Sequence, residues 1–587
     1  MPRIAIVRKE DCNPVGCGNY LCARVCPVNR DGEECIKAGS DGKAEIDEVL
    51  CTGCGICPQK CPYDAIDIIN LPQELAAQPI HQYGRNGFHL YNLPTPIFGS
   101  VVGVLGRNGM GKSTALKILA GLLIPNVGHY EKEENSWDDV IEYFKGTEAQ
   151  LYFEKMRKGD IVVSFKPQSV EAIPQQFKGR VRDLLERANQ QTENRFNEVI
   201  TQLSLNNVLD QDISKVSGGE LQRIAIAAAV LKQANVYIFD EPTAYLDIKQ
   251  RVIVSKFIRE LVNEETAVMV IEHDLIVLDY VADLINIVYG KPTAYGIVSK
   301  PQACKAGINA YLDGVLKAEN MRIRDKPIKF ETHQVKKEQS NVHLTGWKGI
   351  TKRLGDFSLE AQEGELMEQD VIGILGENGI GKTTFVKILA GVIKADSGEI
   401  TNKVKVAYKP QYIESSDDVV MSILGERYEK YHASIMKPLD IDKLLLKKLN
   451  ELSGGELQRV AIANCLSQDA DLFLLDEPSA YLDVEQRLIV SKVIADVMDT
   501  REKACLVVDH DLLFLDYLSR KLIVFDGIPS RKGIVRGPFS MVEGMNTFLE
   551  QLNITLRRDE HSHRPRINNP GSQKDKEQIS QGKRYYV

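Results

Sequence analysis

Nine of the twelve cysteines of this 587-residue chain lie within its first 61 residues. Eight of them form two runs, each followed by a proline: C-x4-C-x4-C-x3-C at Cys12, Cys17, Cys22 and Cys26, and C-x2-C-x2-C-x3-C at Cys51, Cys54, Cys57 and Cys61. Thiolates at such spacings hold [4Fe–4S] clusters. Clustered cysteines in a chain without a secretory signal also favour metal binding over disulfides. The sequence therefore predicts two [4Fe–4S] clusters.

The double run resembles that of two-cluster ferredoxins, in which the fourth cysteine of each run binds the other cluster. The resemblance assigns one cluster to Cys12, Cys17, Cys22 and Cys61, and the other to Cys51, Cys54, Cys57 and Cys26. Zinc is the alternative, but C-x2-C-x2-C is tighter than usual zinc modules. We expect the remaining Cys35 not to be a ligand.

Composition indicates a globular chain of three to five domains, with 43% hydrophobic and 26% charged residues. No apolar stretch is long and uncharged enough to span a membrane, and the N-terminus lacks a secretory signal, so we expect a cytoplasmic protein with no membrane partner. The net charge of −8 argues against general nucleic-acid binding. Two basic segments, 317–337 and 556–587, could still meet phosphate backbones, or simply form solvated surface.

An internal repeat organises the rest of the chain. Five motifs occur twice: GRNGMGKST and GENGIGKTT (106–114 and 376–384), KPQ (166–168 and 409–411), SGGELQR (217–223 and 453–459), FDEPTAYLD and LDEPSAYLD (239–247 and 475–483), and EHD and DHD (272–274 and 509–511). The first copy carries about 27 extra residues between its first two motifs, because Gly111 and Gln168 are 57 positions apart whereas Gly381 and Gln411 are 30 apart. The stretch 137–158 fills this gap, and its periodicity predicts two short helices joined by a turn at Gly146. It is either a partner-docking element or a tolerated surface insertion.

The glycine-rich motif is a P-loop, since a buried strand precedes each copy and a helix follows it. We expect Lys112 and Lys382 to reach the β- and γ-phosphates of ATP, and Ser113 and Thr383 to bind Mg²⁺. The complete predicted nucleotide contacts of the two loops are Gly106, Asn108, Gly109, Gly111, Lys112, Ser113 and Thr114, and Gly376, Asn378, Gly379, Gly381, Lys382, Thr383 and Thr384.

Two apolar strands end in paired carboxylates, which is the arrangement that ATP hydrolysis needs. We expect Asp240 and Asp476 to hold Mg²⁺, and the catalytic residues Glu241 and Glu477 to orient or deprotonate the attacking water. The histidines that follow a later strand in each copy, His273 and His510, could sense the γ-phosphate.

With SGGELQR, all of these motifs resemble the ABC family. The resemblance implies that the two cassettes face each other head to tail, with each ATP between one P-loop and the other cassette's signature. It also adds Gln168 and Gln411 as Mg²⁺ ligands. One site would combine Lys112, Gln168, Asp240, Glu241 and His273 with Ser453 and Gly455, and the other Lys382, Gln411, Asp476, Glu477 and His510 with Ser217 and Gly219.

ABC proteins usually place an aromatic residue that stacks on adenine upstream of the P-loop. Tyr83 or Phe88 would serve at the first site, and Trp347 is the corresponding prediction at the second. The alternative is that these aromatic side chains belong to the core.

The whole chain resembles the RNase L inhibitor family, subfamily E of the ABC proteins. The specific marks are CNPVGCGNYLCARVCPV, CTGCGIC, both SGGELQR copies, DEPSAYLD and LRRDEHSHRPRIN. The resemblance implies ATP-driven splitting of ribosomes after termination or stalling, with the ribosome, its small subunit and a release factor or Pelota-like protein as partners of a monomer. The insertion and the two post-cassette segments would contact the small subunit, and the iron–sulfur domain would move on closure. Asp509 departs from the family pattern, which has Glu.

The expected fold class is multidomain α/β: a ferredoxin-like α+β domain with two [4Fe–4S] clusters, followed by two P-loop ABC domains facing head to tail. The expected ranges are 1–72 (ferredoxin-like), 73–292 (first cassette, insertion about 136–160), 293–338 (first hinge), 339–526 (second cassette) and 527–587 (second hinge and tail). Two other function classes remain, an ATP-gated iron–sulfur redox protein and a transporter ATPase. The chain has no flavin or nicotinamide fingerprint and no membrane span to support them.

Overall fold

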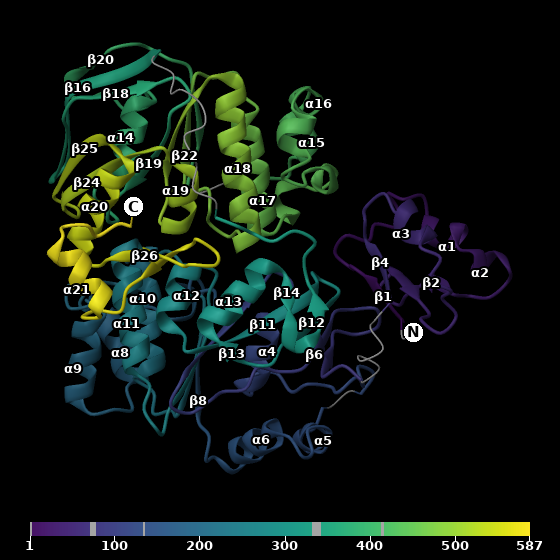
Figure 1. Cartoon of the computed structure of the whole chain (residues 1–587). Coiled ribbons are helices and arrows are strands. Elements are labelled where there is room, and N and C mark those ends of the chain that lie inside the picture. Colours follow the sequence, from purple (N-terminus) through teal and green to yellow (C-terminus); the bar gives the residue numbers. More distant parts are fainter. Residues whose placement is uncertain (1–2, 71–77, 133–134, 331–341, 412–415, 587) are drawn as a thin grey trace.

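The computed structural model describes residues 3–70, 78–132, 135–330, 342–411 and 416–586 (Figure 1). Within these ranges no helix is both long and apolar enough to cross a membrane. Most of the connection expected between the N-terminal domain and the first cassette, and residues 331–341 between the cassettes, lie outside the described residues.

The N-terminal module (residues 3–70) has two small antiparallel sheets and three short helices. Alternation along its first strand divides the side chains between two environments. Ala5 and Val7 pack with the cysteines, whereas Ile4 and Ile6 join the core shared with the cassettes. The elements are β1 (Arg3–Val7) paired with β4 (Ile66–Asn70), β2 (Ile36–Ala38) paired with β3 (Ala44–Ile46), α1 (Leu21–Val25), α2 (Pro27–Arg30) and α3 (Ile56–Lys60).

The first cassette is built on a nine-stranded sheet in the order β5-β6-β12-β11-β7-β10-β9-β8, with β13 paired to β11. Its central strands are parallel and covered on both faces, which explains their nearly continuous apolar sequences. The strands are β5 (His81–Gln82), β6 (His89–Tyr91), β7 (Val101–Gly106), β8 (Val163–Lys166), β9 (Val236–Asp240), β10 (Ala267–Ile271), β11 (Leu284–Lys291), β12 (Tyr295–Val298) and β13 (Gln302–Ala303).

The second cassette repeats this plan in a ten-stranded sheet, ordered β18-β16-β17-β25-β24-β19-β23-β22-β21 with β20 paired to β16. The strands are β16 (His343–Leu354), β17 (Phe357–Ala361), β18 (Gly364–Met367), β19 (Val371–Leu375), β20 (Ser397–Ile400), β21 (Val406–Lys409), β22 (Leu472–Asp476), β23 (Ala504–Val508), β24 (Lys521–Ile528) and β25 (Lys532–Ser540).

Two of the expected domain boundaries need correction. Residue 292 lies in the turn between β11 and β12, and residue 526 lies inside β24. In each case an antiparallel hairpin continues the sheet beyond the boundary, to Ala303 and Ser540. The hairpins were missed because their turns have sequences that are also typical of interdomain linkers.

The extra segment of the first cassette forms two helices, α5 (Trp137–Tyr143) and α6 (Glu148–Lys158), as expected. The turn between them uses Gly146 at a φ of 81°. The pair packs through Phe144 and Phe153 onto the apolar core beneath the first P-loop helix. Figure 1 shows both helices at the end of the molecule away from the second cassette.

The remaining helices cover the sheets and join the cassettes. Helices α12 and α19 contact each other across the interface, where one apolar core runs through both cassettes. The helices are α4 (Lys112–Leu119), α7 (Ile173–Gln176), α8 (Val181–Ala188), α9 (Glu193–Gln202), α10 (Gly218–Val230), α11 (Ile248–Glu260), α12 (Leu275–Val281), α13 (Cys304–Asp313), α14 (Lys382–Leu389), α15 (Val420–Leu424), α16 (Arg427–Lys430), α17 (Gly454–Leu466), α18 (Val484–Arg501) and α19 (Leu512–Leu518).

The segment after the second sheet returns to the first cassette. Arg566 pairs with Asp279 on α12 at 2.5 Å, and the buried Arg564 lies 3.3 Å from the same carboxylate. The end of the chain is held by Tyr586, whose hydroxyl donates to Asp516 at 2.9 Å. The segment therefore links the cassettes. Its elements are α20 (Met541–Leu552), β26 (Leu556–Arg558), β27 (Pro565–Ile567) and α21 (Gln573–Ser580); a short hairpin, β14 (Val315–Leu316) with β15 (Met321–Arg322), follows α13.

Candidate functional site: two composite nucleotide sites

Both P-loops connect a buried strand end to a helix through a glycine with positive φ, Gly111 at 82° and Gly381 at 97°. A side chain at either position would also collide with an aromatic ring, 2.7 Å from Phe88 or Phe357. Glycine is therefore required on both grounds. The backbone N–H groups at the starts of α4 and α14 consequently remain open to an anion.

The P-loop lysines are buried and fold back over their own loops. Lys112 Nζ donates to the carbonyl oxygens of Gly106 (2.9 Å) and Arg107 (2.8 Å). Lys382 Nζ makes the equivalent bonds to Gly376 (2.8 Å) and Glu377 (2.9 Å). Burial lowers the pKa of each ammonium group to about 8. A phosphate placed in either loop would raise these pKa values and strengthen the preference for the charged form.

Each strand-end glutamate is held in an uncommon backbone conformation, with φ of 47° at Glu241 and 48° at Glu477. Gln168 donates to Glu241 Oε1 at 2.8 Å, and Gln411 donates to Glu477 Oε1 at 2.7 Å. Burial raises the pKa of both carboxyl groups, to about 7 for Glu477, with Asp509 and Asp476 adding to the effect there. The Glu477 carboxylate can therefore accept a proton near neutral pH, and the shift at Glu241 is in the same direction.

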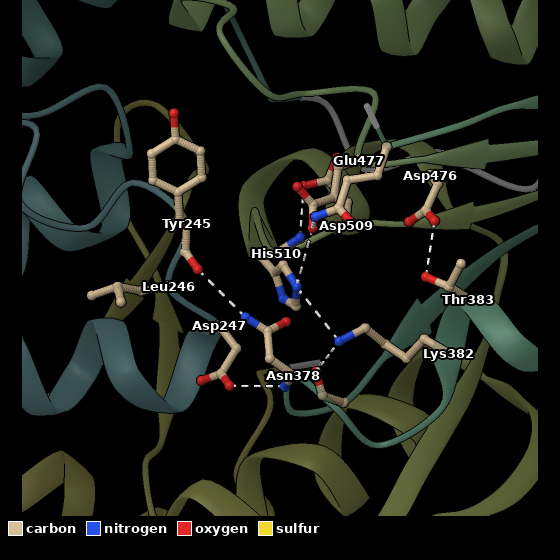
Figure 2. A network of polar contacts seen from close by, with 12 residues as sticks. Tyr245, Leu246, Asp247, Asn378, Lys382, Thr383, Asp476, Glu477, Asp509 and His510 are labelled. Atoms are coloured by element: carbon tan, nitrogen blue, oxygen red, sulfur yellow. Dashed lines mark hydrogen bonds and ion pairs between the residues drawn. The ribbon is translucent and has the colours of Figure 1, made fainter. Parts of the chain in front are cut away.

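The other strand-end groups also converge. His273 Nε2 lies 3.6 Å from Glu241 Oε1, and His510 Nε2 lies 3.7 Å from Glu477 Oε1. Burial lowers the pKa of both histidines well below the usual value, so they are neutral at physiological pH. Thr383 donates to Asp476 at 3.0 Å, as Figure 2 shows.

Sequence reasoning missed the residues that support the two glutamates. Lys166 Nζ donates to the carbonyl oxygens of Asp240 (2.9 Å) and Glu241 (3.1 Å), and Lys409 does the same for Asp476 (2.7 Å) and Glu477 (3.2 Å). Gln222 and Gln458, inside the two signature helices, each add a 2.6 Å bond to the glutamate carbonyl. The signal was present, because the repeated KPQ and LQR motifs contain these residues.

A buried charge cluster at the interface was also missed. Arg251 pairs with Asp274 at 2.8 Å, and Arg487 pairs in the same way with Asp511. Each arginine also donates through Nε, at 2.9 Å, to a carbonyl in the loop after the Asp–Glu pair, that of Leu246 or Leu482. The two arginines therefore tie that loop to the segment that carries the histidine.

Two cavities combine motifs from opposite cassettes. The larger, of about 810 Å³, is lined by the first P-loop, Gln168, Glu241 and His273 together with Ser453 and Gly455 of the second signature. It also extends to His510. The other, of about 360 Å³, is lined by the second P-loop, Gln411, Asp476 and Glu477 together with Ser217 and Gly219. We call these site A and site B.

The loops after the Asp–Glu pairs reach across the interface into the opposite P-loop. The backbone N–H of Asn378 donates to Asp247 at 2.9 Å, and its side chain lies 3.4 Å from the Tyr245 carbonyl oxygen (Figure 2). Asn108 makes the equivalent contacts with Asp483 and Tyr481, both at 3.4 Å. Each P-loop therefore contacts the other cassette directly.

The aromatic predictions are resolved differently at the two sites. The Tyr83 hydroxyl lies 3.2 Å from Thr114 of the P-loop, and Phe88 packs beside Gly111. Trp347 was a wrong prediction for site B: it is buried in the core and packs edge-on against Phe385. Phe357, which lines site B beside Gly381, has the position equivalent to that of Phe88. Trp347 lies on the strand before the correct one, so proximity in sequence alone was misleading.

The cysteines of the N-terminal module gather in two groups. Cys12, Cys17, Cys22 and Cys61 line one small cavity, so the end of the second run lies with the first. Cys57 interacts electrostatically with Cys51, Cys54 and Cys26, and also with Cys22. Cys35 is buried beside Cys26 and Cys51. No disulfide joins any of the twelve cysteines, and among the described residues no group of three or more His, Cys, Asp or Glu side chains is arranged to hold a metal ion.

The comparisons with known proteins follow the same division of the chain. A family model described as ABC transporter matches residues 98–244 and 356–480. The chain is 50% identical over its whole length to an uncharacterized ABC transporter ATP-binding protein, MJ0719, of Methanocaldococcus jannaschii, covering 98% of that protein. It is 44% identical, again over its whole length, to the translation initiation factor RLI1 of Saccharomyces cerevisiae, covering 98% of it.

Two solved structures are similar over all or most of the chain. A model of ribosome-bound archaeal Pelota and ABCE1 contains a chain with 49% identity and a TM-score of 0.93, and the match covers 100% of this chain and 99% of that one. A crystal structure of the archaeal ribosomal stalk protein aP1 with the archaeal ribosome recycling factor aABCE1 gives 50% identity and a TM-score of 0.81, covering 87% of this chain and 99% of that one. With its twin composite sites, this chain belongs to the RNase L inhibitor family, subfamily E of the ABC ATPases.

Proposed function

We propose that the chain is an ATP-driven ribosome recycling factor of the cytoplasm, which separates the ribosomal subunits after termination or stalling. The observation that carries the proposal is the pair of composite sites, because ATP bound in either site would contact both cassettes and hold them together. The likeness to ribosome-bound ABCE1 over the whole chain, and to a ribosome recycling factor over 87% of it, supports the assignment to ribosome recycling. The proposed partners are the ribosome, its small subunit and a Pelota-like protein or release factor.

At site A, Lys112 and the P-loop N–H groups would hold the phosphates, while Ser113, Gln168 and Asp240 supply oxygen ligands of the kind that Mg²⁺ prefers. Bound Mg²⁺ would neutralise charge on the phosphates. Glu241 would accept a proton from the attacking water, and His273 would donate a hydrogen bond to the γ-phosphate. At site B the same roles fall to Lys382, Thr383, Gln411, Asp476, Glu477 and His510.

The signature of the opposite cassette would complete each site. Ser453 and Ser217 cap the 13-residue helices α17 and α10, whose N-termini line sites A and B. A helix N-terminus attracts anions, so the γ-phosphate would draw the signature toward the P-loop. Hydrolysis removes that attraction and permits reopening.

We also propose that the N-terminal module holds two [4Fe–4S] clusters with crossed ligands, Cys12, Cys17, Cys22 and Cys61 for one and Cys51, Cys54, Cys57 and Cys26 for the other. The cavity that the first four cysteines share and the electrostatic interactions of Cys57 with the other three support this assignment. Bound clusters would supply rigid crosslinks to a module with little other core. Anaerobically purified protein should contain about eight iron and eight acid-labile sulfide per chain. Cys35→Ser should leave both unchanged and Cys54→Ser should lose a cluster; stoichiometric zinc would overturn the assignment.

Closure of the cassettes can separate ribosomal subunits only if an attached body moves. The N-terminal module is the natural lever, and the α5–α6 insertion is the proposed attachment to the small subunit. Deleting residues 1–72 should leave ATP binding largely intact but abolish splitting, whereas deleting 137–158 should weaken small-subunit binding.

The test is subunit separation, followed by light scattering in anaerobic buffer with ATP and the Pelota-like partner. Binding of radiolabelled ATP to the same preparations shows whether the cassettes remain intact. Equal splitting by the truncated and full-length proteins would exclude the lever.

A further inference from the structure

The N-terminal module contacts both halves of site A. Asn86, between Tyr83 and Phe88 in the aromatic loop, is buried and exchanges hydrogen bonds of 2.8 and 3.0 Å with the backbone of Ile46 in the module. At the equivalent place beside site B stands Gly355, where a side chain would meet open space. The aromatic loop of site A is thus part of the module interface, whereas among the described residues that of site B makes no equivalent contact at Gly355.

The second contact is with the signature that completes site A. Lys447 Nζ lies 2.9 Å from Asp11 of the module and 3.3 Å from Glu456 of the second signature. Glu456 in turn accepts hydrogen bonds from the backbone N–H (2.9 Å) and hydroxyl (2.7 Å) of Ser453. One half-buried ammonium group therefore joins the module to the residue that caps the signature helix.

Within the described part of the chain, the first signature has no such connection to the module. Gln211 stands six residues before Ser217, where Lys447 stands six residues before Ser453. Its side-chain amide donates to the Asn207 carbonyl oxygen at 3.3 Å. Glu220 makes the same capping bonds to Ser217 as Glu456 makes to Ser453. The two signatures therefore share the cap but differ in the lysine.

A chain of ion pairs continues from Lys447 through the module to the first cassette. Asp11 lies 3.1 Å from Arg8, and Arg8 shares Asp67 with Lys291. Lys291 ends β11, and two residues later the Thr293 N–H donates to the Gly109 carbonyl oxygen of the first P-loop at 2.8 Å. The module thus connects the P-loop side of site A with the signature side.

We propose that Lys447 is a positioning residue that latches the N-terminal module to the second signature, so that site A alone must break this contact in order to close. The inference rests on the proposed function, in which the signature approaches the opposite P-loop. Movement of the second signature toward the first P-loop displaces Lys447 relative to Asp11, because the module is held to the first cassette by Asn86. Site B closes without disturbing any of these pairs.

The test measures each site alone in the full-length, anaerobically prepared protein. Hydrolysis in a Glu477→Gln background reports site A, and hydrolysis in a Glu241→Gln background reports site B. Lys447→Ala and Asp11→Asn should each raise turnover at site A about two- to five-fold, as the loss of one partly exposed ion pair allows. Neither should change site B, and the double variant should match the single ones because both remove one contact.

Lys448→Ala is the matched control, since Lys448 pairs only loosely with Asp417, at 3.4 Å, on the surface. Lys447→Arg should restore the original rate at site A. Iron content checks that Asp11→Asn retains the module's clusters; if it does not, Lys447→Ala, which lies in the second cassette, decides the result. Unchanged or lower turnover at site A, or an equal rise at both sites, would overturn the latch. If the two background variants do not silence their sites, the site assignments fail instead.

Discussion

Sites A and B carry the same motifs but have different surroundings. Both sites contain the same reacting groups, namely a lysine, a glutamine, an aspartate, a glutamate and a histidine. The distances between these groups are similar in the two sites. Around them, site A is contacted by the N-terminal module, whereas site B has Tyr408 beside Asp476, at 3.5 Å, where site A has Phe165. The internal repeat thus preserves the same reacting groups in both sites, whereas the different residues around each site allow hydrolysis to be regulated differently at each.

The loops near the histidines are held by side chains of different length. Asp509 accepts hydrogen bonds from the N–H (3.0 Å) and hydroxyl (2.7 Å) of Ser479 and from the backbone N–H groups of His510 (2.7 Å) and Asp511 (2.9 Å). The equivalent Glu272 accepts longer bonds from the backbone N–H groups of His273 (3.2 Å) and Asp274 (3.5 Å), and it also interacts with Thr243, the counterpart of Ser479. The shorter carboxylate therefore holds the same two loops with shorter bonds, and we expect unequal rates at the two sites.

The largest effect is expected from removing either catalytic carboxylate. Glu241→Gln and Glu477→Gln should each lower hydrolysis at their own site by at least about 10²-fold, because an amide cannot accept the proton. Each variant should retain ATP at that site, as measured by filter binding after a chase. Total turnover should differ between the two variants; identical turnover would contradict the inequality of the sites.

Removing either supporting lysine should cost stability equally in both cassettes. Lys166→Met and Lys409→Met each remove one donor from two buried carbonyl oxygens, of which the glutamate's keeps its bond from Gln222 or Gln458. We expect a loss of about 1–3 kcal/mol in the free energy of unfolding. The adjacent glutamate should then move and lower turnover at its own site about tenfold. Urea denaturation and single-site hydrolysis measure the two effects, with the exposed Lys256→Met as the control. A large effect in one cassette only would show that the supports are not equivalent.

Site B should depend on pH near neutrality. Burial, with Asp509 and Asp476, raises the pKa of Glu477 to about 7, so its base form is lost as the pH falls through that value. In a Glu241→Gln background, hydrolysis should therefore rise with pH around 7. Asp509→Asn removes a neighbouring negative charge and should move this rise to lower pH. A profile that is flat from pH 6 to 8 would argue against Glu477 as the proton acceptor.

The smallest effect is expected at the pair Phe165 and Tyr408. Tyr408→Phe removes a long hydrogen bond to Asp476 and should change the Mg²⁺ concentration for half-maximal hydrolysis at site B about twofold. Phe165→Tyr should produce the opposite change at site A. Titration of Mg²⁺ in the two single-site backgrounds separates the effects, and a change of more than tenfold would mean that Tyr408 has a larger role.

Much of this arrangement could be predicted from the sequence, because the repeated motifs identify phosphate-binding loops, strand ends and signatures by local rules. The assignment of Trp347 was wrong because a position upstream of the P-loop does not by itself decide which side chain lines the site. The neighbouring strand, which carries Phe357, forms the wall of the site. The hairpins beyond residues 292 and 526 were missed because a turn and a linker share residue types. The contact between Asp11 and Lys447 had no signal at all, since it joins surface charges from distant parts of the chain.

The head-to-tail pairing of motifs is the central claim, and combined variants test it most directly. Lys382→Ala with Ser217→Arg damages site B twice and should retain the hydrolysis of site A, at the level of Lys382→Ala alone. Lys382→Ala with Ser453→Arg damages both sites and should reduce hydrolysis to background. The reverse outcome, with activity surviving only in the second combination, would contradict the composite sites and the closure that depends on them.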